Sequence, residues 1–112
     1  MWLTTPLGFF SAVQKPNTDH LTVRSRVRAD LDRLRDHVCP ELGPTITGAG
    51  TDYPYRAACS HEAWATALAA MARDIDYGNF KATVAQRQGY GRARVYGRVW
   101  EQLLALEQEE AR

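Results

Sequence analysis

The chain has 112 residues, of which 45% are hydrophobic and 24% are charged, and its formal net charge at pH 7 is +1. This length is sufficient for one hydrophobic core, so we predict a single domain over residues 1–112. The small net charge excludes a general electrostatic attraction to nucleic acid, so any such attraction must come from a local cluster of basic residues.

We expect a cytoplasmic protein that binds no metal and no cofactor. The opening MWLTTPLGFF lacks the basic segment and apolar run of a secretory signal, and no stretch reaches the roughly 18 apolar residues of a membrane span. Cys39 and Cys59 form no zinc-binding pattern with the three histidines, so we expect two reduced, partly buried thiols. The chain also has no Walker, GxGxxG or GxSxG motif.

The first half of the chain has the pattern of a β-hairpin followed by a helix. Phe9–Lys15 has aromatic and β-branched residues, residues 16–20 form a turn cluster, and Leu21–Ser25 alternates between apolar and polar residues. We predict that Ser25 caps the helix and that Pro40 stops it. The apolar stripe expected on this helix is Val27, Leu31, Leu34 and Val38.

Charged residues on the other face of this helix alternate in sign at spacings of three and four residues. Each ion pair at such a spacing stabilises a helix by about 0.2–0.5 kcal/mol. The predicted pairs are Arg26 with Asp30, Arg28 with Asp32, and Asp30 with Arg33.

A second hairpin and helix are predicted over residues 43–75. Thr45–Thr47 and Tyr55–Cys59 are the expected strands, with glycines and Asp52 in the turn region, and Ser60 is the expected helix cap. The second apolar stripe repeats the first at an offset of 37 residues, which indicates either ordinary amphipathic spacing or a twofold β-β-α repeat. This stripe consists of Trp64, Leu68, Met71 and Ile75.

The last third of the chain is predicted to be helical. Asn79 is the expected cap of a short helix through Arg87, and Gly89 ends it. A last helix runs from Gly91 to about Glu109, and an acidic tail over residues 107–112 is expected to be frayed. Its apolar face consists of Val95, Val99, Leu103 and Leu106, with Tyr96 and Trp100 beside them. The predicted fold is α+β, with about four antiparallel strands in β-β-α-β-β-α order, helices on one face, and two C-terminal helices.

A basic segment with interleaved aromatic residues is the first candidate site. Every charged residue from Tyr77 to Arg98 is basic, and guanidinium groups suit phosphates as aromatic rings suit bases. These residues therefore indicate either a nucleic-acid or polyanion surface or a solvated helix face. The candidate binding residues are Lys81, Arg87, Tyr90, Arg92, Arg94 and Arg98.

Helical geometry separates the arginines of this segment. At about 100° per residue, Arg94 and Arg98 project towards solvent, opposite the apolar face. Arg92 falls at the apolar angle and therefore needs a partner, which is either an internal carboxylate such as Asp74 or Asp76 or the anion of a ligand.

The alanine-rich stretch AWATALAAMA, residues 63–72, is the second candidate because it has no charged residue on any side. An amphipathic surface helix has a polar back, so this one is expected to be covered by the C-terminal helices or by a second copy of the chain. The candidate interface positions are Ala63, Thr66 and Ala70.

Two further groupings have weaker patterns. The acid and base groups that a metal-dependent hydrolase or nuclease could use are His61 with Glu62, and Asp74 with Asp76. We do not expect this activity, because such an enzyme needs carboxylates that converge on one point. The stretch TDYPYR, residues 51–56, either covers a sheet face with tyrosines or forms a recognition surface.

Several blocks of the sequence resemble those of a family of small bacterial proteins of unknown function. The blocks are GFFSAVQK, TDYPYRA, and DIDYGNFK followed by VYGRVW, and the likeness extends from about Trp2 to Leu106. The resemblance implies a self-contained bacterial cytoplasmic domain and transfers no role to any residue. The functional hypotheses are therefore a polyanion-binding module, a homodimeric or protein-interaction module, and an enzyme, in that order.

Overall fold

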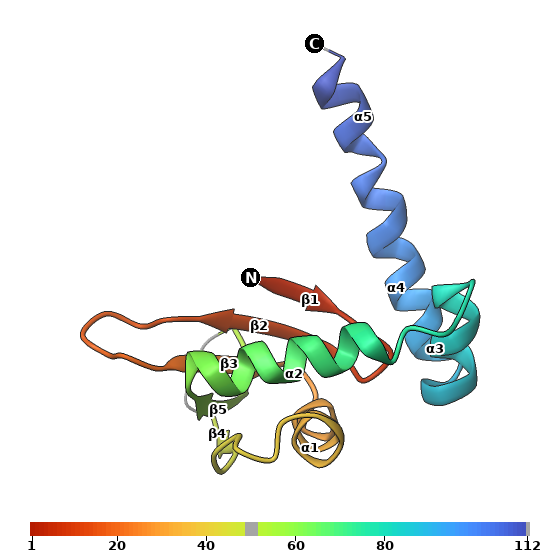
Figure 1. Ribbon diagram of the computed structural model, residues 1–112. Coiled ribbons are helices and arrows are strands. Elements are labelled where there is room, and N and C mark those ends of the chain that lie inside the picture. Colours follow the sequence, from red (N-terminus) through yellow and green to blue (C-terminus); the bar gives the residue numbers. More distant parts are fainter. Residues whose placement is uncertain (49–51, 112) are drawn as a thin grey trace. The chain divides into compact units, whose positions relative to one another are not determined.

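The computed structural model describes residues 1–48 and 52–111, and these residues divide into two compact units (Figure 1). The first unit, Met1–Asp76, contains one sheet and two helices, and the second begins at Tyr77 and is helical. The strands are β1 (Trp2–Thr4), β2 (Phe9–Val13), β3 (Leu21–Ser25), β4 (Ile46–Thr47) and β5 (Tyr55–Cys59). The helices are α1 (Arg28–His37), α2 (His61–Arg73), α3 (Phe80–Gln88), α4 (Tyr90–Leu103) and α5 (Ala105–Glu110).

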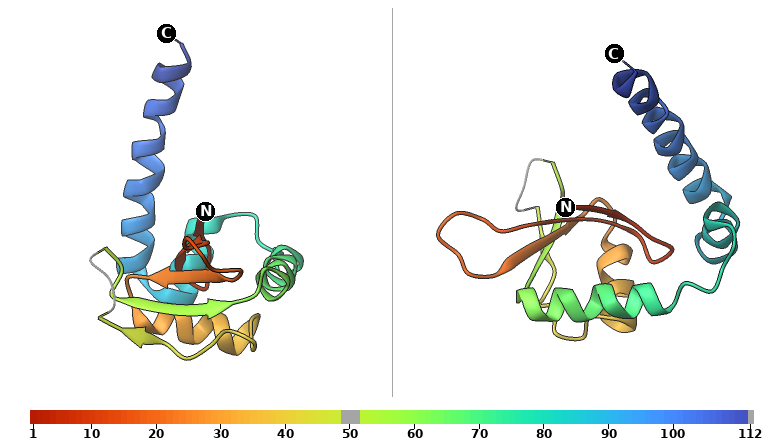
Figure 2. Two further views of the ribbon diagram at one scale, coloured as in Figure 1. Left: turned by 90° about the vertical axis from the view of Figure 1, so that its left-hand side faces the viewer. Right: turned by 45° about the horizontal axis from the view of Figure 1, so that its top comes forward.

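The five described strands form one antiparallel sheet in the order β1-β2-β3-β5-β4 (Figure 2). The predicted α+β class, the antiparallel sheet and the pair of C-terminal helices are confirmed, whereas the strand number and order are wrong. The missed strand is β1, which has only three residues and too little alternation to be recognised in the sequence. A tight turn joins it to β2, in which the amide of Thr5 donates to the carbonyl of Gly8 at 2.9 Å.

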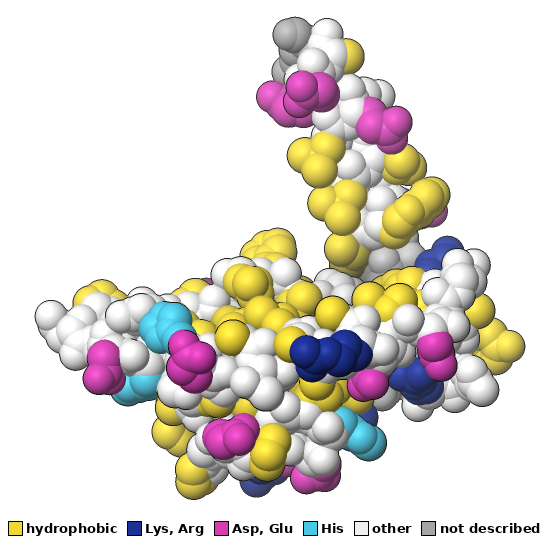
Figure 3. All heavy atoms as spheres, in the orientation of Figure 1, with side chains coloured by type: hydrophobic (Ala, Val, Ile, Leu, Met, Phe, Trp, Pro, Cys, Tyr) yellow, Lys and Arg dark blue, Asp and Glu magenta, His cyan; other side chains and the backbone are white. Residues whose placement is uncertain are grey.

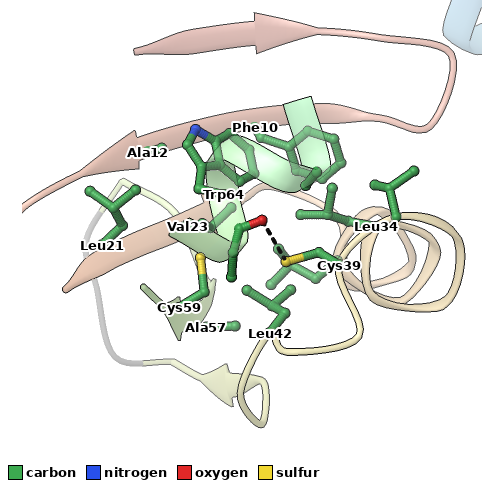
Figure 4. Close-up of a cluster of buried hydrophobic side chains, with 14 residues drawn as sticks. Phe10, Ala12, Leu21, Val23, Leu34, Cys39, Leu42, Ala57, Cys59 and Trp64 are labelled. Carbon is green, nitrogen blue, oxygen red and sulfur yellow. Dashed lines mark hydrogen bonds between the residues drawn. The ribbon is translucent and has the colours of Figure 1, made fainter. Parts of the chain in front are cut away.

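One face of the sheet forms the hydrophobic core of the first unit. The register aligns Ala12, Val23 and Ala57 across three adjacent strands, and all three side chains are buried. Side chains from α1 and α2, including Leu34 and Trp64, complete the same cluster, as Figure 4 shows. Both helices therefore cover one face, and the opposite face of the sheet has no helix from this cluster.

The observed bounds of α1 and α2 place residues of both predicted apolar stripes outside the helices. Ser25 does not cap α1, because it stays in β3 opposite Tyr55 and its hydroxyl donates to the carbonyl of Val27 at 2.7 Å. Val27 consequently precedes the helix and is exposed, while Ile75 follows the end of α2 and is also exposed. The predicted caps at Ser60 and Asn79 are confirmed, since each accepts a hydrogen bond from the backbone amide three residues later.

Ion pairing around α1 also differs from the prediction. Asp30 pairs with Arg33 as expected, but Asp32 pairs with Arg35 at 3.3 Å. Arg26 and Arg28 do not form the predicted pairs on the helix, because their guanidinium groups contact residues before β5 and in β4. The Arg26 guanidinium donates to the backbone carbonyl of Asp52, and that of Arg28 donates to the Thr47 hydroxyl.

Asp30 links α1 to the turn between β1 and β2. Its side chain is only 2% exposed, and it accepts a hydrogen bond from the amide of Phe9 at 3.1 Å. Arg33, its ion-pair partner, donates through Nε to the carbonyl of Leu7 at 2.8 Å. Gly8 lies so close that an added Cβ would collide with the carboxyl carbon of Asp30. A buried charge thus positions this turn.

The two cysteines are free thiols that lie together in the core, as labelled in Figure 4. Burial raises the pKa of Cys39, and burial together with the neighbouring Cys39 raises the pKa of Cys59 from 9.0 to about 11. The folded protein therefore keeps its thiols protonated at a pH where the thiols of the unfolded chain ionise.

This shift predicts a loss of stability at alkaline pH. The contribution of Cys59 is fully present below pH 9 and is lost between about pH 9 and 11, because only the unfolded state releases the proton in that window. Each unit of pKa difference corresponds to about 1.4 kcal/mol. Urea denaturation from pH 8 to 11 should give a shallower decline for Cys59→Ala than for the wild type, and equal declines would contradict the assignment.

Among the described residues, no helix combines the length and the apolar composition that crossing a membrane requires. Residues 49–51, which include part of the predicted turn of the second hairpin, lie outside the described part of the chain, as does residue 112 of the predicted frayed tail. Glu107–Glu110 of that tail are helical. The single domain remains a prediction.

Candidate nucleic-acid interface

The second unit places basic and aromatic side chains around one open groove. The Asn79 carboxamide caps α3 by accepting from the amide of Ala82 at 2.8 Å, and Gly89, with φ 93°, ends α3 and begins α4. The two helices pack through a stack of Phe80 on Tyr96, whose ring centroids are 5.8 Å apart. Tyr96 is consequently buried and serves the packing of this unit.

The α3–α4 groove encloses about 620 Å³ and is lined by residues of both helices and by the cap of α3. Its lining includes three alanines and Gly97 beside the polar and aromatic groups. The lining residues are Asn79, Lys81, Ala82, Ala85, Tyr90, Ala93, Arg94, Gly97, Arg98, Trp100 and Glu101.

Four of the six predicted binding residues line this groove, namely Lys81, Tyr90, Arg94 and Arg98. Arg87 is exposed in the last turn of α3 but is not part of the lining. Arg92 is half-buried and donates to the hydroxyl of Tyr96 at 3.3 Å, so we do not count it among the binding groups.

The cations of the groove have no ion pair with a carboxylate of any described residue. The ion pairs between arginines and carboxylates among these residues, Arg33 with Asp30 and Arg35 with Asp32, lie in the first unit. Glu101 lines the groove three residues after Arg98, so it reduces the local positive charge without neutralising it. The groove therefore presents three cations and one carboxylate to an incoming ligand.

Trp100 lines the groove but was not among the predicted binding residues. It is 60% exposed, and the ammonium of Lys81 lies 5.8 Å from the centre of its ring. The sequence placed Trp100 beside the apolar face of the last helix, which did not distinguish it from a core residue. The pairing of Lys81 with Trp100 joins two helices, so it depends on how α3 packs on α4.

The predicted interface on α2 is not supported by its burial. Ala63 belongs to the core of the first unit, Ala70 packs against that core, and only Thr66 is exposed. One side of the uncharged stretch, with Trp64 and Ala67, belongs to the core of the first unit, whereas Ala65 and Ala72 are exposed. A homodimer through Ala63, Thr66 and Ala70 would require opening this core.

The acid and base groups proposed for an enzyme do not converge. His61 and Glu62 begin α2 and Asp74 follows its end, so the rise of 1.5 Å per residue separates the two groupings by about 18 Å. No group of three or more metal-ligating side chains occurs in the described parts of the chain. The two groupings therefore do not form one site.

No protein-family model, no curated protein and no solved structure matches the chain. The resemblance to a bacterial family remains a prediction, and functional assignment depends on the geometry of the chain itself.

Proposed function

We propose that the second unit binds single-stranded nucleic acid through the α3–α4 groove. The observation that supports this proposal most directly is the meeting of three cations and two exposed aromatic rings in one open groove. Cations that track phosphates and rings that stack on bases are the two elements that sequence-tolerant recognition of single strands requires.

The order of these groups along α4 suits an extended strand. Tyr90 and Trp100, which are 77% and 60% exposed, are ten residues apart, or about 15 Å along a helix. Arg94 and Arg98 lie between them, one helical turn apart, and both are exposed. A strand that stacks a base at each end would therefore pass its intervening phosphates over the two guanidinium groups.

The charge distribution also explains how such binding is compatible with a net charge of +1. Between Tyr77 and Arg98 there is no acidic residue, whereas the acidic residues of the second unit begin at Glu101. A strand bound in the groove would meet a local positive field, and its affinity would depend on counterion release more than on the total charge of the protein.

Fluorescence anisotropy with a labelled oligothymidylate tests this function. We expect the Arg94→Gln and Arg98→Gln double variant to bind at least about 10-fold more weakly than the wild type, with a salt slope smaller by about 1.4, because each phosphate contact with a single strand contributes about 0.7 to that slope. Trp100→Ala should weaken binding by about 5-fold or more through the loss of stacking.

Arg73→Gln is the control, because it removes one of the two positive charges that the double variant loses, from an exposed arginine at the end of α2 in the first unit. It should bind like the wild type. The proposal is wrong if the wild type shows no binding at low salt, or if the control and the double variant lose the same affinity.

A second candidate function, self-association, is favoured by a different face of α4 and α5. The side chains of this face are 45% to 61% exposed, and none of them lines the groove. Figure 3 shows hydrophobic side chains gathered along α4, with acidic side chains towards the C-terminal end of α5. We refer to Val95, Val99, Leu103 and Leu106 as the apolar stripe.

The charges along these helices favour a second copy in antiparallel orientation as the partner of the stripe. The basic residues of α4 end at Arg98, and every charged residue from Glu101 through Glu110 is acidic. A twofold axis between Arg98 and Glu101 would place each basic half beside the acidic half of the other copy, whereas a parallel pair would juxtapose like charges. The resulting dimer would bury the stripe and leave the groove on another face.

A further inference from the structure

The face of the sheet opposite the core carries a cluster of arginines. The register places Arg24 of β3 directly between Ser11 of β2 and Arg56 of β5, and all three side chains project from this outer face. Residues directly opposite each other on antiparallel strands have Cα atoms only about 4.5–5.5 Å apart, and like charges in that position destabilise the sheet. The pairing of Arg24 with Arg56 therefore needs a compensating group.

The protein holds the Arg24 guanidinium in place without neutralising it. Nη2 of Arg24 donates to the hydroxyl of Ser11 at 2.7 Å, and Ser11 is itself buried. The guanidinium groups of Arg24 and Arg26 each lie over the ring of Tyr53, 4.7 Å from its centre. Arg26 in turn donates to the backbone carbonyl of Asp52 at 2.8 Å. These contacts orient the cations and leave their charge intact.

Two donors of the cluster are buried and lack an acceptor among the described residues. They are the Nε atoms of Arg24 and Arg56. None of Arg24, Arg26 and Arg56 has an ion pair with a carboxylate in the described part of the chain. A buried N–H group without an acceptor is costly, and the cost is larger for a charged group. Both the unsatisfied donors and the repulsion would be removed by one anion that bridges the two guanidinium groups.

We propose that the outer face of the sheet binds a phosphate group between Arg24 and Arg56. A guanidinium presents Nε and Nη hydrogens as a fork that matches two oxygens of a phosphate, and two such forks provide four donors to one tetrahedral anion. Tyr53 is buried and already contacts two guanidinium groups, so it supports the cations and does not stack on a base. The ligand is therefore inorganic phosphate or a terminal phosphate of a larger molecule.

This site is independent of the proposed nucleic-acid groove. All of its residues belong to the first unit, and none of them lines the α3–α4 groove. A variant of either site should leave the other unaffected, so the failure of one proposal is distinguishable from the failure of the other.

Thermal unfolding of the full chain in sodium phosphate, compared with sodium chloride at equal ionic strength, tests the site. We expect the midpoint of the wild type to rise by about 3–8 °C more than that of Arg56→Gln, because a ligand that binds only the folded state stabilises it. A general stabilising effect of phosphate as a salt would appear equally in both proteins and in the control Arg73→Gln.

The order of the two midpoints in chloride provides a second readout. There Arg56→Gln should unfold at the same temperature as the wild type or higher, because the substitution removes repulsion with Arg24 and no hydrogen bond that the structure shows. In phosphate the order should reverse. A merely structural role of Arg56 would instead lower the midpoint of the variant in both salts, and this result would overturn the proposal.

Direct titration distinguishes the source of the phosphate. The ³¹P resonance of inorganic phosphate should broaden and shift with the wild type and with Arg73→Gln but not with Arg56→Gln. Adenosine monophosphate that binds at least as tightly as phosphate would indicate a terminal phosphoester, and weaker binding would indicate the free ion. Binding of adenosine monophosphate without any binding of inorganic phosphate would contradict the site.

Discussion

The Asp30→Ala variant is expected to lose about 3 kcal/mol of unfolding free energy, which is a large fraction of the stability of a domain of this size. The carboxylate is 2% exposed, accepts from the amide of Phe9 and pairs with Arg33. Its removal leaves the partly buried amide of Phe9 without that acceptor and Arg33 without that carboxylate, in addition to a cavity. Urea denaturation followed by circular dichroism at neutral pH measures the difference.

Asp32→Ala provides a matched control on the same helix. Asp32 also forms an ion pair three residues away, with Arg35 at 3.3 Å, but its side chain is 50% exposed. Solvent screens an ion pair at such a position, so the loss should stay below about 1 kcal/mol. Losses of similar size in the two variants would show that the link between α1 and the β1–β2 turn contributes little to stability.

Introducing a charge into the apolar stripe is expected to weaken self-association strongly. In the antiparallel dimer Leu103 would be buried against the other copy, so Leu103→Glu should raise the dissociation constant at least about 30-fold, as for the loss of a central interface residue. Sedimentation velocity over a concentration series measures this change. The control is Ile75→Glu, because Ile75 is equally exposed but lies outside the stripe.

Cysteine cross-linking separates the antiparallel dimer from a parallel one. Val99→Cys lies next to the proposed twofold axis, so under oxidising conditions it should form a disulfide with its copy. Leu106→Cys should not, because in an antiparallel pair its counterpart lies more than three helical turns away. The native cysteines are buried and should not interfere. A wild type that stays monomeric at every concentration, or efficient cross-linking through Leu106→Cys, would contradict the model.

Local elements were predictable because their signals are contained in a few neighbouring residues. The caps at Ser60 and Asn79 were recognised from a side chain that reaches its own helix, and the end of α3 from Gly89. Ser25 was misassigned by the same reasoning, because pairing with Tyr55 on a strand thirty residues later keeps it in the sheet. A pattern of neighbouring residues does not reveal that one of them will pair with a strand far away in the sequence.

Some features of the candidate site were likewise predictable from the sequence, and others were not. The run of basic and tyrosine residues after Tyr77 is visible in the sequence, and helical spacing correctly directed Arg94 and Arg98 towards solvent. Spacing did not show that Trp100 would meet Lys81, because that contact joins two helices. It also did not show that the apolar stripe stays exposed, since periodicity identifies an apolar face but not the surface that covers it.

The amino-acid sequence alone determined most of the strands and helices, apart from β1 and the division of the last helix into α4 and α5. It also determined that one stretch concentrates positive charge. These properties depend on spacing within a few residues. Only the tertiary structure decided that Arg24 and Arg56 lie opposite each other on the outer face of the sheet. The reason is physical: strand register is set by long-range hydrogen bonds and by the shared core of Phe10, Val23 and Ala57, and no local pattern records which residues those bonds align.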